Sequence, residues 1–397
     1  MLKNLFLTTI SLLVCIALQA QHGCIIKGSI QNDSLFQERK RMDKIYLSKI
    51  DEYDRLITID SAQLKKGSFE FRYKMKPGEP VMIYALTGFD NGQIPVFVEP
   101  GTVNVEIKKA AFPAAAQVSG TPTNNLYHEY KQITERCIQE QMDSLNLFKK
   151  TKQNLDQWMN SKEGQAEWQQ IGAASLVKCT EERIRFLMDH NDSPLAPLMM
   201  EKEIYYMLDN KYAEQMFQSL APSLFHHPYY RSFSNTIRAL DLKVGGELPD
   251  ITLPLADGTE TTLAKYRGKF VLLDFWASWC GPCRKEVPYM VQLYNETRDK
   301  KEQFAIISFS LDNKKKDWQD AIVKLGMDKD GWVHASDLLG WGSPAAQMMG
   351  VTAIPKTILI DPEGRAISFS LRGEEMVTRV KEILAGDRSY EGMDDGK

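Results

Sequence analysis

Hydrophobic and polar residues alternate in short runs over residues 24–107, and turn sequences separate one run from the next. Pro77-Gly78 and Pro100-Gly101 are two of these turns. Alternation with a period of two predicts strands that bury one face, and a spacing of about ten residues favours a β-sandwich. We therefore predict a sandwich-like domain over 21–115, with strands at 24–30, 44–48, 56–60, 68–73, 81–86, 95–98 and 103–107.

The hydrophobic period changes to three or four residues between positions 120 and 240, as on the buried face of an amphipathic helix. The sequence Asn191-Asp192-Ser193-Pro194 ends one repeat and begins another. We predict a helical region here, in which aromatic and methionine residues form a core stripe; a partner-binding surface is the alternative. The first repeat comprises Leu126, Tyr130, Ile133, Cys137, Met142, Leu145 and Phe148, and the stripe comprises Tyr205, Tyr206, Met207, Met216 and Phe217.

A continuous apolar run at 269–275 follows a linker at 243–249 and leads directly to Cys280-Gly281-Pro282-Cys283. Such a run predicts a parallel strand buried on both faces, and the next helix then begins at the cysteines. Residues i and i+3 share one face of a helical turn, so the two sulfurs can form a disulfide. Cys280, at the exposed helix N-terminus, meets unpaired N–H groups and the positive end of the helix dipole, which favour its thiolate.

This arrangement predicts dithiol–disulfide exchange, in which Cys283 resolves a mixed disulfide by attack from one turn deeper. A structural zinc site is the alternative. It needs four ligands, and the chain has no second Cys-X-X-Cys or close Cys/His pair. We therefore expect neither a metal nor a cofactor at the cysteines.

Two further residues are candidates for the same site. Asp274 lies inside the apolar run, where burial should raise its pKa and suit it to accept a proton from Cys283. Its alternative role is that of an aspartate that caps the next helix.

Pro355 stands at the head of a later apolar strand and is a candidate for a cis peptide bond. The backbone of Ala353 and Ile354 could then pair with an extended segment of a substrate, whereas the alternative is a rigid joint between loop and strand.

Together these residues resemble the active-site stretch of the thioredoxin superfamily, including the buried acid, a tryptophan before the first cysteine and Pro288 five residues after the second. The resemblance implies an α/β thioredoxin-like domain over 245–390, with a central mixed sheet flanked by helices. It implies that Cys280 is the nucleophile, Cys283 the resolving thiol, Asp274 the proton acceptor and Pro355 the cis-proline. The substrate-binding residues that it implies are Trp279, Gly281, Pro282, Ile354 and Pro355.

Within the superfamily, the sequence at 283–288 and the leader segments at 248–258 and 263–269 resemble the secreted TlpA/ResA branch. A predicted helix at 314–325 and a loop at 331–334 are consistent with the insertion typical of that branch. His334 in this loop is interpreted as a packing residue, with a position at the border of the site as the alternative. Lys356 replaces the usual threonine and is expected to alter charge preference for a partner. Residues 59–71 resemble an uncharacterised N-terminal domain of Bacteroidetes envelope proteins.

The first residues predict export. Lys3 precedes an apolar run at 5–18, which is too short to span a membrane, and Leu18-Gln19-Ala20 is a cleavage sequence, so we interpret residues 1–20 as a signal peptide. An uncleaved signal anchor is the alternative.

Five of the six cysteines remain after cleavage. Cys137 and Cys179 lie in helical patterns where pairing is conceivable, and we interpret them as buried free thiols.

The resulting hypothesis is an exported thiol–disulfide oxidoreductase of the periplasm or cell envelope. Its expected partners are envelope proteins with disulfides or thiols and a membrane-bound electron donor, in settings such as cytochrome c-type biogenesis. Reduction is favoured because Gly281-Pro282 resembles the reducing members. The net charge of −3 argues against nucleic acid as a partner.

Two other functions are kept as alternatives. One is a binding or envelope-assembly protein with an accessory redox domain. The other is a thiol peroxidase, which would need a threonine or serine and a proline where Ala277 and Leu273 stand.

Overall fold

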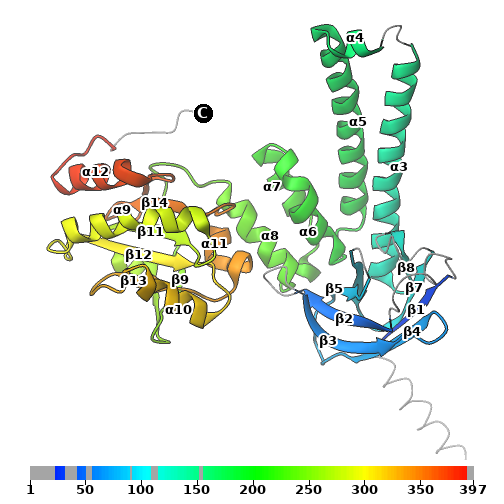
Figure 1. The fold of residues 1–397 in the computed structure, drawn as a ribbon, viewed down its shortest axis with the longest axis horizontal. Helices are drawn as coiled ribbons and strands as arrows, with labels where there is room; N and C mark the ends of the chain where they lie inside the picture. Colours follow the sequence, from blue (N-terminus) through cyan, green and yellow to red (C-terminus); the bar gives the residue numbers. More distant parts are fainter. Residues whose placement is uncertain are drawn as a thin grey trace, which may run out of the picture. The chain divides into compact units, whose positions relative to one another are not determined.

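The computed structural model describes residues 23–31, 43–50, 56–89, 92–108, 115–151 and 155–390 (Figure 1). The signal peptide predicted for residues 1–20 lies outside the described residues. The chain divides into two compact units, the first ending at Phe233 and the second beginning at Ser234. No helix in the described ranges is long and apolar enough to cross a membrane.

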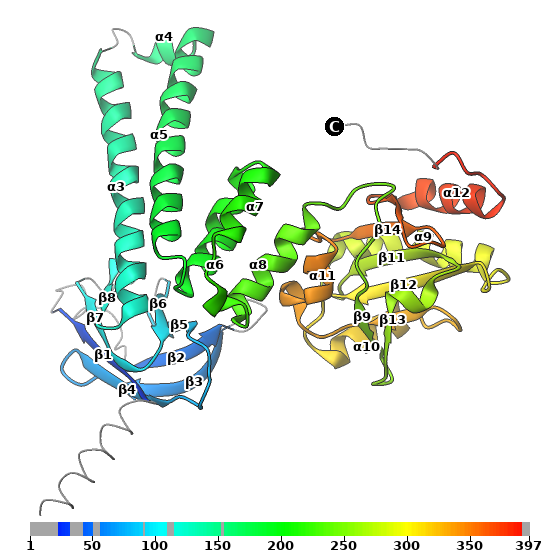
Figure 2. The same ribbon diagram turned by 180° about the vertical axis from the view of Figure 1, so that it is seen from behind.

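Two four-stranded sheets pack against each other in the first unit, as the alternating pattern predicts (Figure 2). Their strand orders are β4-β1-β7-β8 and β3-β2-β5-β6, and neighbouring strands are antiparallel except for β1 and β7. The seven predicted strands are confirmed; the pattern does not predict β8, which has only three residues. The strands are β1 (Gly23–Ile30), β2 (Lys44–Ile50), β3 (Leu56–Gln63), β4 (Ser68–Lys74), β5 (Met82–Thr87), β6 (Ile94–Val98), β7 (Gly101–Ile107) and β8 (Gln117–Ser119).

Side chains from both sheets meet in one core. Ile26 of β1 and Ile45 and Leu47 of β2 are fully buried there. Gly28 also lies on the inner face, and a Cβ at this position would come within 1.9 Å of the Phe69 ring, so the ring occupies the space that a side chain would need. Burial of each large apolar side chain contributes about 1.5–3 kcal/mol, and this contribution holds the two sheets together.

The helical region begins where α3 (Pro122–Thr151) meets the edge strand β6. The buried amide of Asn124 accepts a hydrogen bond from Phe97 N at 2.9 Å and donates one to Phe97 O at 2.8 Å, as a neighbouring strand would. The carboxylate of Glu99 accepts bonds from Thr123 N at 2.8 Å and Thr123 Oγ1 at 2.9 Å. Glu99 thereby caps the first turn of α3 and complements its positive dipole end.

Helix α3 and α5 (Lys162–Asp189) form a long antiparallel hairpin, with α4 (Leu155–Met159) at its turn (Figure 1). Ser161 caps α5, because its Oγ accepts a hydrogen bond from Gly164 N at 3.0 Å. At the turn, the ring of Phe148 packs between Trp158 and Trp168, with centroid distances of 4.7 and 6.0 Å. The hairpin is therefore held together at its tip by an aromatic cluster.

Shorter helices complete the first unit and pack through aromatic rings. The ring of Phe233 is fully buried and contacts Tyr205 and Phe217 at centroid distances of 6.2 and 5.4 Å. Met216 is buried too, but the prediction is wrong for Tyr206, which is 65% exposed. Tyr206 lies in a 3-10 turn, whose residues follow a different period from the helix pattern. The elements are α6 (Leu195–Met199), η2 (Met200–Ile204), η3 (Tyr205–Met207), α7 (Asn210–Gln218), η4 (Pro222–Leu224) and α8 (Pro228–Ala239), the last of which ends in the second unit.

The second unit is built on a five-stranded mixed sheet with the order β13-β12-β11-β14-β15. Strands β11, β12 and β13 are parallel, whereas β14 is antiparallel to β11 and β15 is antiparallel to β14. This confirms the predicted central mixed sheet. The strands are β11 (Phe270–Trp276), β12 (Phe304–Ser310), β13 (Val333–Ala335), β14 (Lys356–Ile360) and β15 (Ala366–Ser368), beside the hairpin of β9 (Thr252–Pro254) and β10 (Glu260–Thr262).

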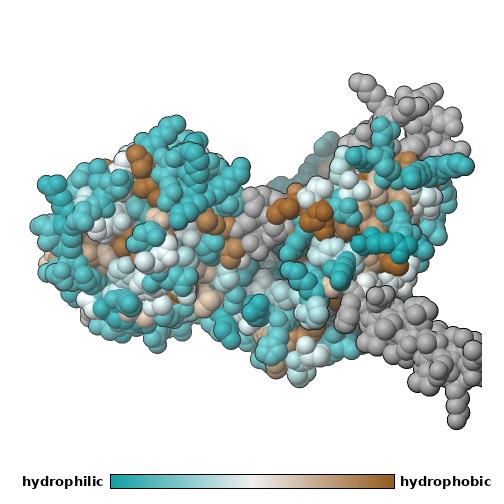
Figure 3. Space-filling model, turned by 90° about the horizontal axis from the view of Figure 1, so that it is seen from below, coloured by the Kyte–Doolittle hydropathy of each residue, from teal (hydrophilic) through white to brown (hydrophobic). Residues whose placement is uncertain are grey.

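Helices cover both faces of this sheet. In Figure 1, α9 and α12 lie side by side on one face and α10 lies on the other. The predicted helix at 314–325 is α10, but the predicted loop at 331–334 is partly wrong, because its last two residues begin β13. Polar residues cover most of the surface in Figure 3, with apolar patches between them. The helices are α9 (Gly281–Thr297), α10 (Lys315–Lys324), α11 (Pro344–Met348) and α12 (Gly373–Leu384), with 3-10 turns η5 (Leu263–Tyr266) and η6 (Gly340–Gly342).

The contact between α3 and β6 gives a prediction about stability. The substitution Asn124→Ala should lower the free energy of unfolding by about 2–4 kcal/mol, because two buried backbone groups of Phe97 lose their partner. Asn125→Ala is the matched control. Its amide accepts one exposed bond from Gly120 N, so we expect a loss below about 1 kcal/mol. Urea denaturation followed by circular dichroism measures both, and equal losses would contradict the role given to Asn124.

Candidate active site

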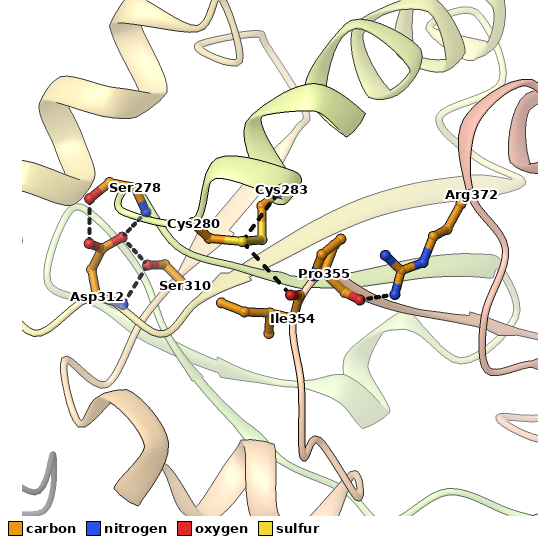
Figure 4. Close-up of a disulfide and its surroundings, with 8 residues drawn as sticks. All are labelled: Ser278, Cys280, Cys283, Ser310, Asp312, Ile354, Pro355 and Arg372. Atoms are coloured by element: carbon orange, nitrogen blue, oxygen red, sulfur yellow. Dashed lines mark hydrogen bonds between the residues drawn. A yellow bond between two sulfur atoms is a disulfide. The ribbon is translucent and has the colours of Figure 1, made fainter. Parts of the chain in front are cut away.

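Strand β11 leads directly into the loop that carries the site. Every residue of β11 is buried, because β12 and β14 flank it and helices cover both faces of the sheet. The loop after it ends at Cys280, which is the N-cap of α9, and Cys280 Sγ accepts a hydrogen bond from Cys283 N at 3.1 Å. The two cysteines form a disulfide (Figure 4). The spacing in the sequence thus corresponds to one helical turn, as predicted.

The predicted exposure of Cys280 is wrong. Only 5% of this residue is exposed, and Cys283 is buried as well. The Cys280 sulfur is bonded to Cys283, and it lies 3.8 Å from the carbonyl oxygen of Ile354, so two neighbours cover it. In contrast, Trp279 is 52% exposed and Pro282 is also exposed. The disulfide therefore lies just beneath a surface that Trp279 and Pro282 form.

Asp312 fixes the loop that precedes Cys280 (Figure 4). Its buried carboxylate accepts hydrogen bonds from Ser278 N at 2.7 Å, Ser278 Oγ at 2.5 Å and Ser310 Oγ at 2.7 Å. Leu311 N also donates to Trp276 O at 2.8 Å, which continues the pairing of β11 with β12 past the strand ends. Sequence reasoning misses Asp312. Its only signal is a polar pair, Ser310 and Asp312, directly after a buried strand.

Asp274 is buried in the middle of the sheet, as predicted, and this burial raises its pKa. Burial raises the pKa to about 7, and the negative charge of Glu286 adds to the rise. A hydrogen bond from Ser308 Oγ, 3.2 Å from the carboxylate, and the positive charge of Arg372 act in the opposite direction. Since Glu286 lies in α9 and Arg372 caps α12, the carboxylate is within electrostatic reach of the helices on the cysteine side of the sheet.

The hydroxyl of Ser308 is itself held in place. Trp332 Nε1 donates a hydrogen bond to Ser308 Oγ at 3.0 Å, so Trp332, Ser308 and Asp274 form a chain of hydrogen bonds. His334 stacks on Trp332 and its Nε2 lies 3.0 Å from Met327 O. The interpretation of His334 as a packing residue agrees with these contacts. Neither Ser308 nor Trp332 is distinguished in the sequence, because a serine in a buried strand and a tryptophan in a loop are common.

The peptide bond between Ile354 and Pro355 is cis, as predicted. Figure 4 shows this segment facing the disulfide, with the guanidinium of Arg372 donating a hydrogen bond to Pro355 O. Lys356, next in the chain, is half-buried, and its ammonium group lies 5.3 Å from the centre of the Phe369 ring. Burial lowers the pKa of Lys356, and the charge of Arg372 lowers it further. Two cationic side chains therefore flank the proline.

Comparison with known proteins agrees with this geometry. Residues 243–384 match the Redoxin family, and residues 24–127 match a domain of unknown function, DUF4369. The chain is 30% identical over 148 residues to the thiol-disulfide oxidoreductase ResA of Bacillus thuringiensis subsp. konkukian, a match that covers 36% of this chain and 78% of that protein. The chain belongs to the ResA-like thiol-disulfide oxidoreductases. It is an oxidoreductase whose redox domain lies in the second unit.

Other ResA-like relatives match a similar share of the chain. The ResA of Geobacillus thermodenitrificans is 32% identical over 150 residues, which is 38% of this chain and 74% of that protein. Among solved structures, the thioredoxin domain of a thiol-disulfide oxidoreductase from Bacteroides vulgatus has 31% identity and a TM-score of 0.34, and the match covers 36% of this chain and 99% of that one.

The burial of Asp274 gives a prediction about stability and pH. The folded-state pKa of about 7 lies above the ordinary aspartate value of 3.8, so the folded protein binds more protons than the unfolded chain between pH 3.8 and pH 7. Stability should therefore fall as the pH rises from about 4 to 7, by up to about 4 kcal/mol. Asp274→Asn should remove this loss and stabilise the protein most above pH 7.

The measurement is urea denaturation of oxidised wild type and variant from pH 4.5 to 8.5, followed by tryptophan fluorescence. The control is Asp257→Asn. Asp257 is exposed, and hydrogen bonds from Thr259 hold its pKa below the usual range, so its ionised form is favoured in the folded state. The control should give no advantage that grows with pH. A constant difference between Asp274→Asn and wild type across the range would contradict the assignment.

Proposed function

We propose that this oxidoreductase is exported and reduces the disulfides of envelope proteins through Cys280 and Cys283. The observation that carries the proposal is the position of the disulfide, at the first turn of α9 and 3.8 Å from the carbonyl that precedes the cis-proline. This position places the Cys280 sulfur at the N-terminus of α9 and next to the backbone of Ile354. Nucleophilic attack and the docking of an extended substrate can therefore take place at one point.

In the first step of the reaction, Cys280 acts as the nucleophile. Its sulfur caps α9, so the backbone N–H of Cys283 and the helix dipole stabilise the thiolate. The thiolate attacks one sulfur of the substrate disulfide, a mixed disulfide forms, and the other substrate sulfur leaves as a thiolate that takes up a proton.

In the second step, Cys283 releases the product. Asp274 accepts the proton of the Cys283 thiol, and the resulting thiolate attacks Cys280 Sγ of the mixed disulfide. The bond between Cys280 and the substrate breaks, the substrate sulfur leaves as a thiolate that takes up a proton to give the dithiol, and the Cys280–Cys283 disulfide is restored. With a pKa of about 7, Asp274 can both take and give up a proton near neutral pH. Each cycle transfers two electrons to the substrate, so an electron donor must reduce the disulfide again, and we propose a membrane-bound donor.

The surface around the disulfide is proposed to bind the substrate. Trp279, Gly281 and Pro282 are proposed to form one side, and Ile354 the other, with Pro355 buried next to it. The backbone N–H of Ile354 has no hydrogen-bond partner among the described residues, so it is available to an extended segment of a substrate. The carbonyl of Pro355 is occupied by Arg372, which restricts pairing to the residues before the proline.

The location and organisation of the protein are part of the same proposal. We propose cleavage of a signal peptide at 1–20, a β domain at 21–115, a helical region at 120–240 and a redox domain at 245–390. The redox domain would then work in the periplasm or cell envelope, for example in cytochrome c-type biogenesis, and nucleic acid is not a partner.

Substitution of the cysteines tests the reaction. Cys280→Ser should reduce the turnover of insulin disulfides with dithiothreitol to background, because the attacking thiolate is lost. Cys283→Ser should instead accumulate mixed disulfides through Cys280, which non-reducing gels and mass spectrometry detect. Full activity in Cys280→Ser would overturn the proposed function. A binding protein with an accessory redox domain predicts the same cellular phenotype for wild type and the Cys280→Ser/Cys283→Ser double variant.

Ser308 tests the role of Asp274 in the second step. Its hydrogen bond favours the carboxylate, so Ser308→Ala should raise the pKa of Asp274 and shift the rising limb of the reductase pH profile upward from about pH 7. Asp274→Asn should lower the rate of the second step by about 10²–10⁴-fold below the wild-type plateau. The control is Ser370→Ala, which changes an exposed serine outside the hydrogen-bond chain of Asp274. An unshifted profile in Ser308→Ala would argue against Asp274 as the proton acceptor.

A further inference from the structure

The α3–α5 hairpin carries two cysteines that face each other. Cys137 in α3 is only 8% exposed, and Cys179 in α5 is partly exposed. Both thiols are free, and the neighbouring Cys137 raises the pKa of Cys179, as expected for two thiols that lie close together. Neither residue belongs to the site of Cys280 and Cys283, which lies in the other unit.

Two ion pairs between α3 and α5 lie next to these thiols and show the register of the two helices. Arg136 Nη2 contacts Glu182 Oε2 at 2.5 Å, and Lys178 Nζ contacts Glu140 Oε2 at 2.7 Å. The first pair joins the residue before Cys137 to the residue three after Cys179. The second pair joins the residue before Cys179 to the residue three after Cys137. This reciprocal arrangement places the two cysteines opposite each other across the antiparallel helices.

We propose that Cys137 and Cys179 are a second dithiol–disulfide pair, whose oxidised form cross-links α3 to α5. The thiolate of one cysteine attacks a low-molecular-weight disulfide such as glutathione disulfide, and one glutathione leaves as a thiol. The second cysteine attacks the mixed disulfide and releases the other glutathione. Two protein thiols are oxidised to one disulfide, and one glutathione disulfide is reduced to two thiols. The pairing itself does not depend on the proposed function, whereas export would place it in an oxidising compartment.

The surroundings of Cys137 and Cys179 determine how fast these thiols are oxidised and which cysteines form the disulfide. Burial raises the pKa of Cys179 to about 12, and Cys137 adds to this rise, so little thiolate is present at neutral pH. Oxidation should therefore be slow at pH 7 and faster at pH 9. Cys24, the remaining cysteine of the described chain, lies in the core between the two sheets and is not part of the hairpin. It should stay a thiol.

The experiment uses the full chain with Cys280→Ser and Cys283→Ser, so that the first dithiol does not contribute. The protein is unfolded in concentrated urea with a reductant, freed of the reductant and refolded in a buffer of reduced and oxidised glutathione. Refolding from urea exposes every thiol to the oxidant. Proteolysis and mass spectrometry without reduction should then find one linked peptide pair, Cys137 with Cys179, while Cys24 remains free for alkylation.

Thermal unfolding measures how much the cross-link stabilises the first unit. Oxidation should raise the midpoint of unfolding of the first unit by several degrees, because the disulfide restricts the unfolded chain, and dithiothreitol should reverse the shift. The same chain with Cys179→Ser or Cys179→Ala should give no shift. The proposal is overturned if Cys137 and Cys179 are recovered as thiols or as separate glutathione adducts, or if either one is linked to Cys24. Loss of reductase activity in Cys280→Ser bears only on the first dithiol.

Discussion

Burial of β11 on both faces is the constraint on which the active site depends. A central strand with helices above and below must be apolar, and β11 meets this requirement at every position except Asp274. The carboxyl group is buried, so its neutral form is favoured and its pKa rises toward 7. The same strand also determines where the chain leaves the sheet. It ends next to β12 and β14, so the loop to Cys280 lies between Asp312 on one side and Ile354 on the other.

Two buried aspartates near this loop have different surroundings, and the difference supports the proton-transfer role proposed for Asp274. The carboxylate of Asp312 accepts three hydrogen bonds from Ser278 and Ser310 and thereby holds the loop before Cys280 in place. Asp274 accepts one bond, from Ser308, among the described residues. A carboxylate that accepts several hydrogen bonds is suited to a structural role, whereas a buried one that accepts a single bond is suited to proton transfer. The site thus combines a rigid loop with an acid that can change its charge.

Much of this organisation is predictable because it depends on local patterns. Alternation identifies seven strands of the sandwich, and the continuous run at 269–275 identifies the buried strand before the cysteines. The burial of Asp274 follows from its place in that run. Long-range contacts are not predictable in this way. Asp312 binds Ser278 and Arg372 binds Pro355, each more than fifteen positions away, and nothing in the neighbouring sequence indicates these two distant partners. The exposure of Cys280 is wrongly predicted for the same reason, since Ile354 covers its sulfur from a distant segment.

The position of a cysteine along its helix explains how one chain can hold two thiol pairs of unlike reactivity. Cys280 stands at an N-cap, where backbone N–H groups have no partner within the helix and one of them reaches the sulfur. Cys179 lies well inside α5, where the N–H groups are already bonded within the helix and burial opposes the thiolate. Exchange with a substrate needs a thiolate that forms and leaves readily, which the first position provides. A cross-link that persists needs the opposite, and the interior of a helical hairpin provides it. Separate helix positions would therefore keep the dithiol of Cys280 and Cys283 chemically distinct from the proposed cross-link of Cys137 and Cys179.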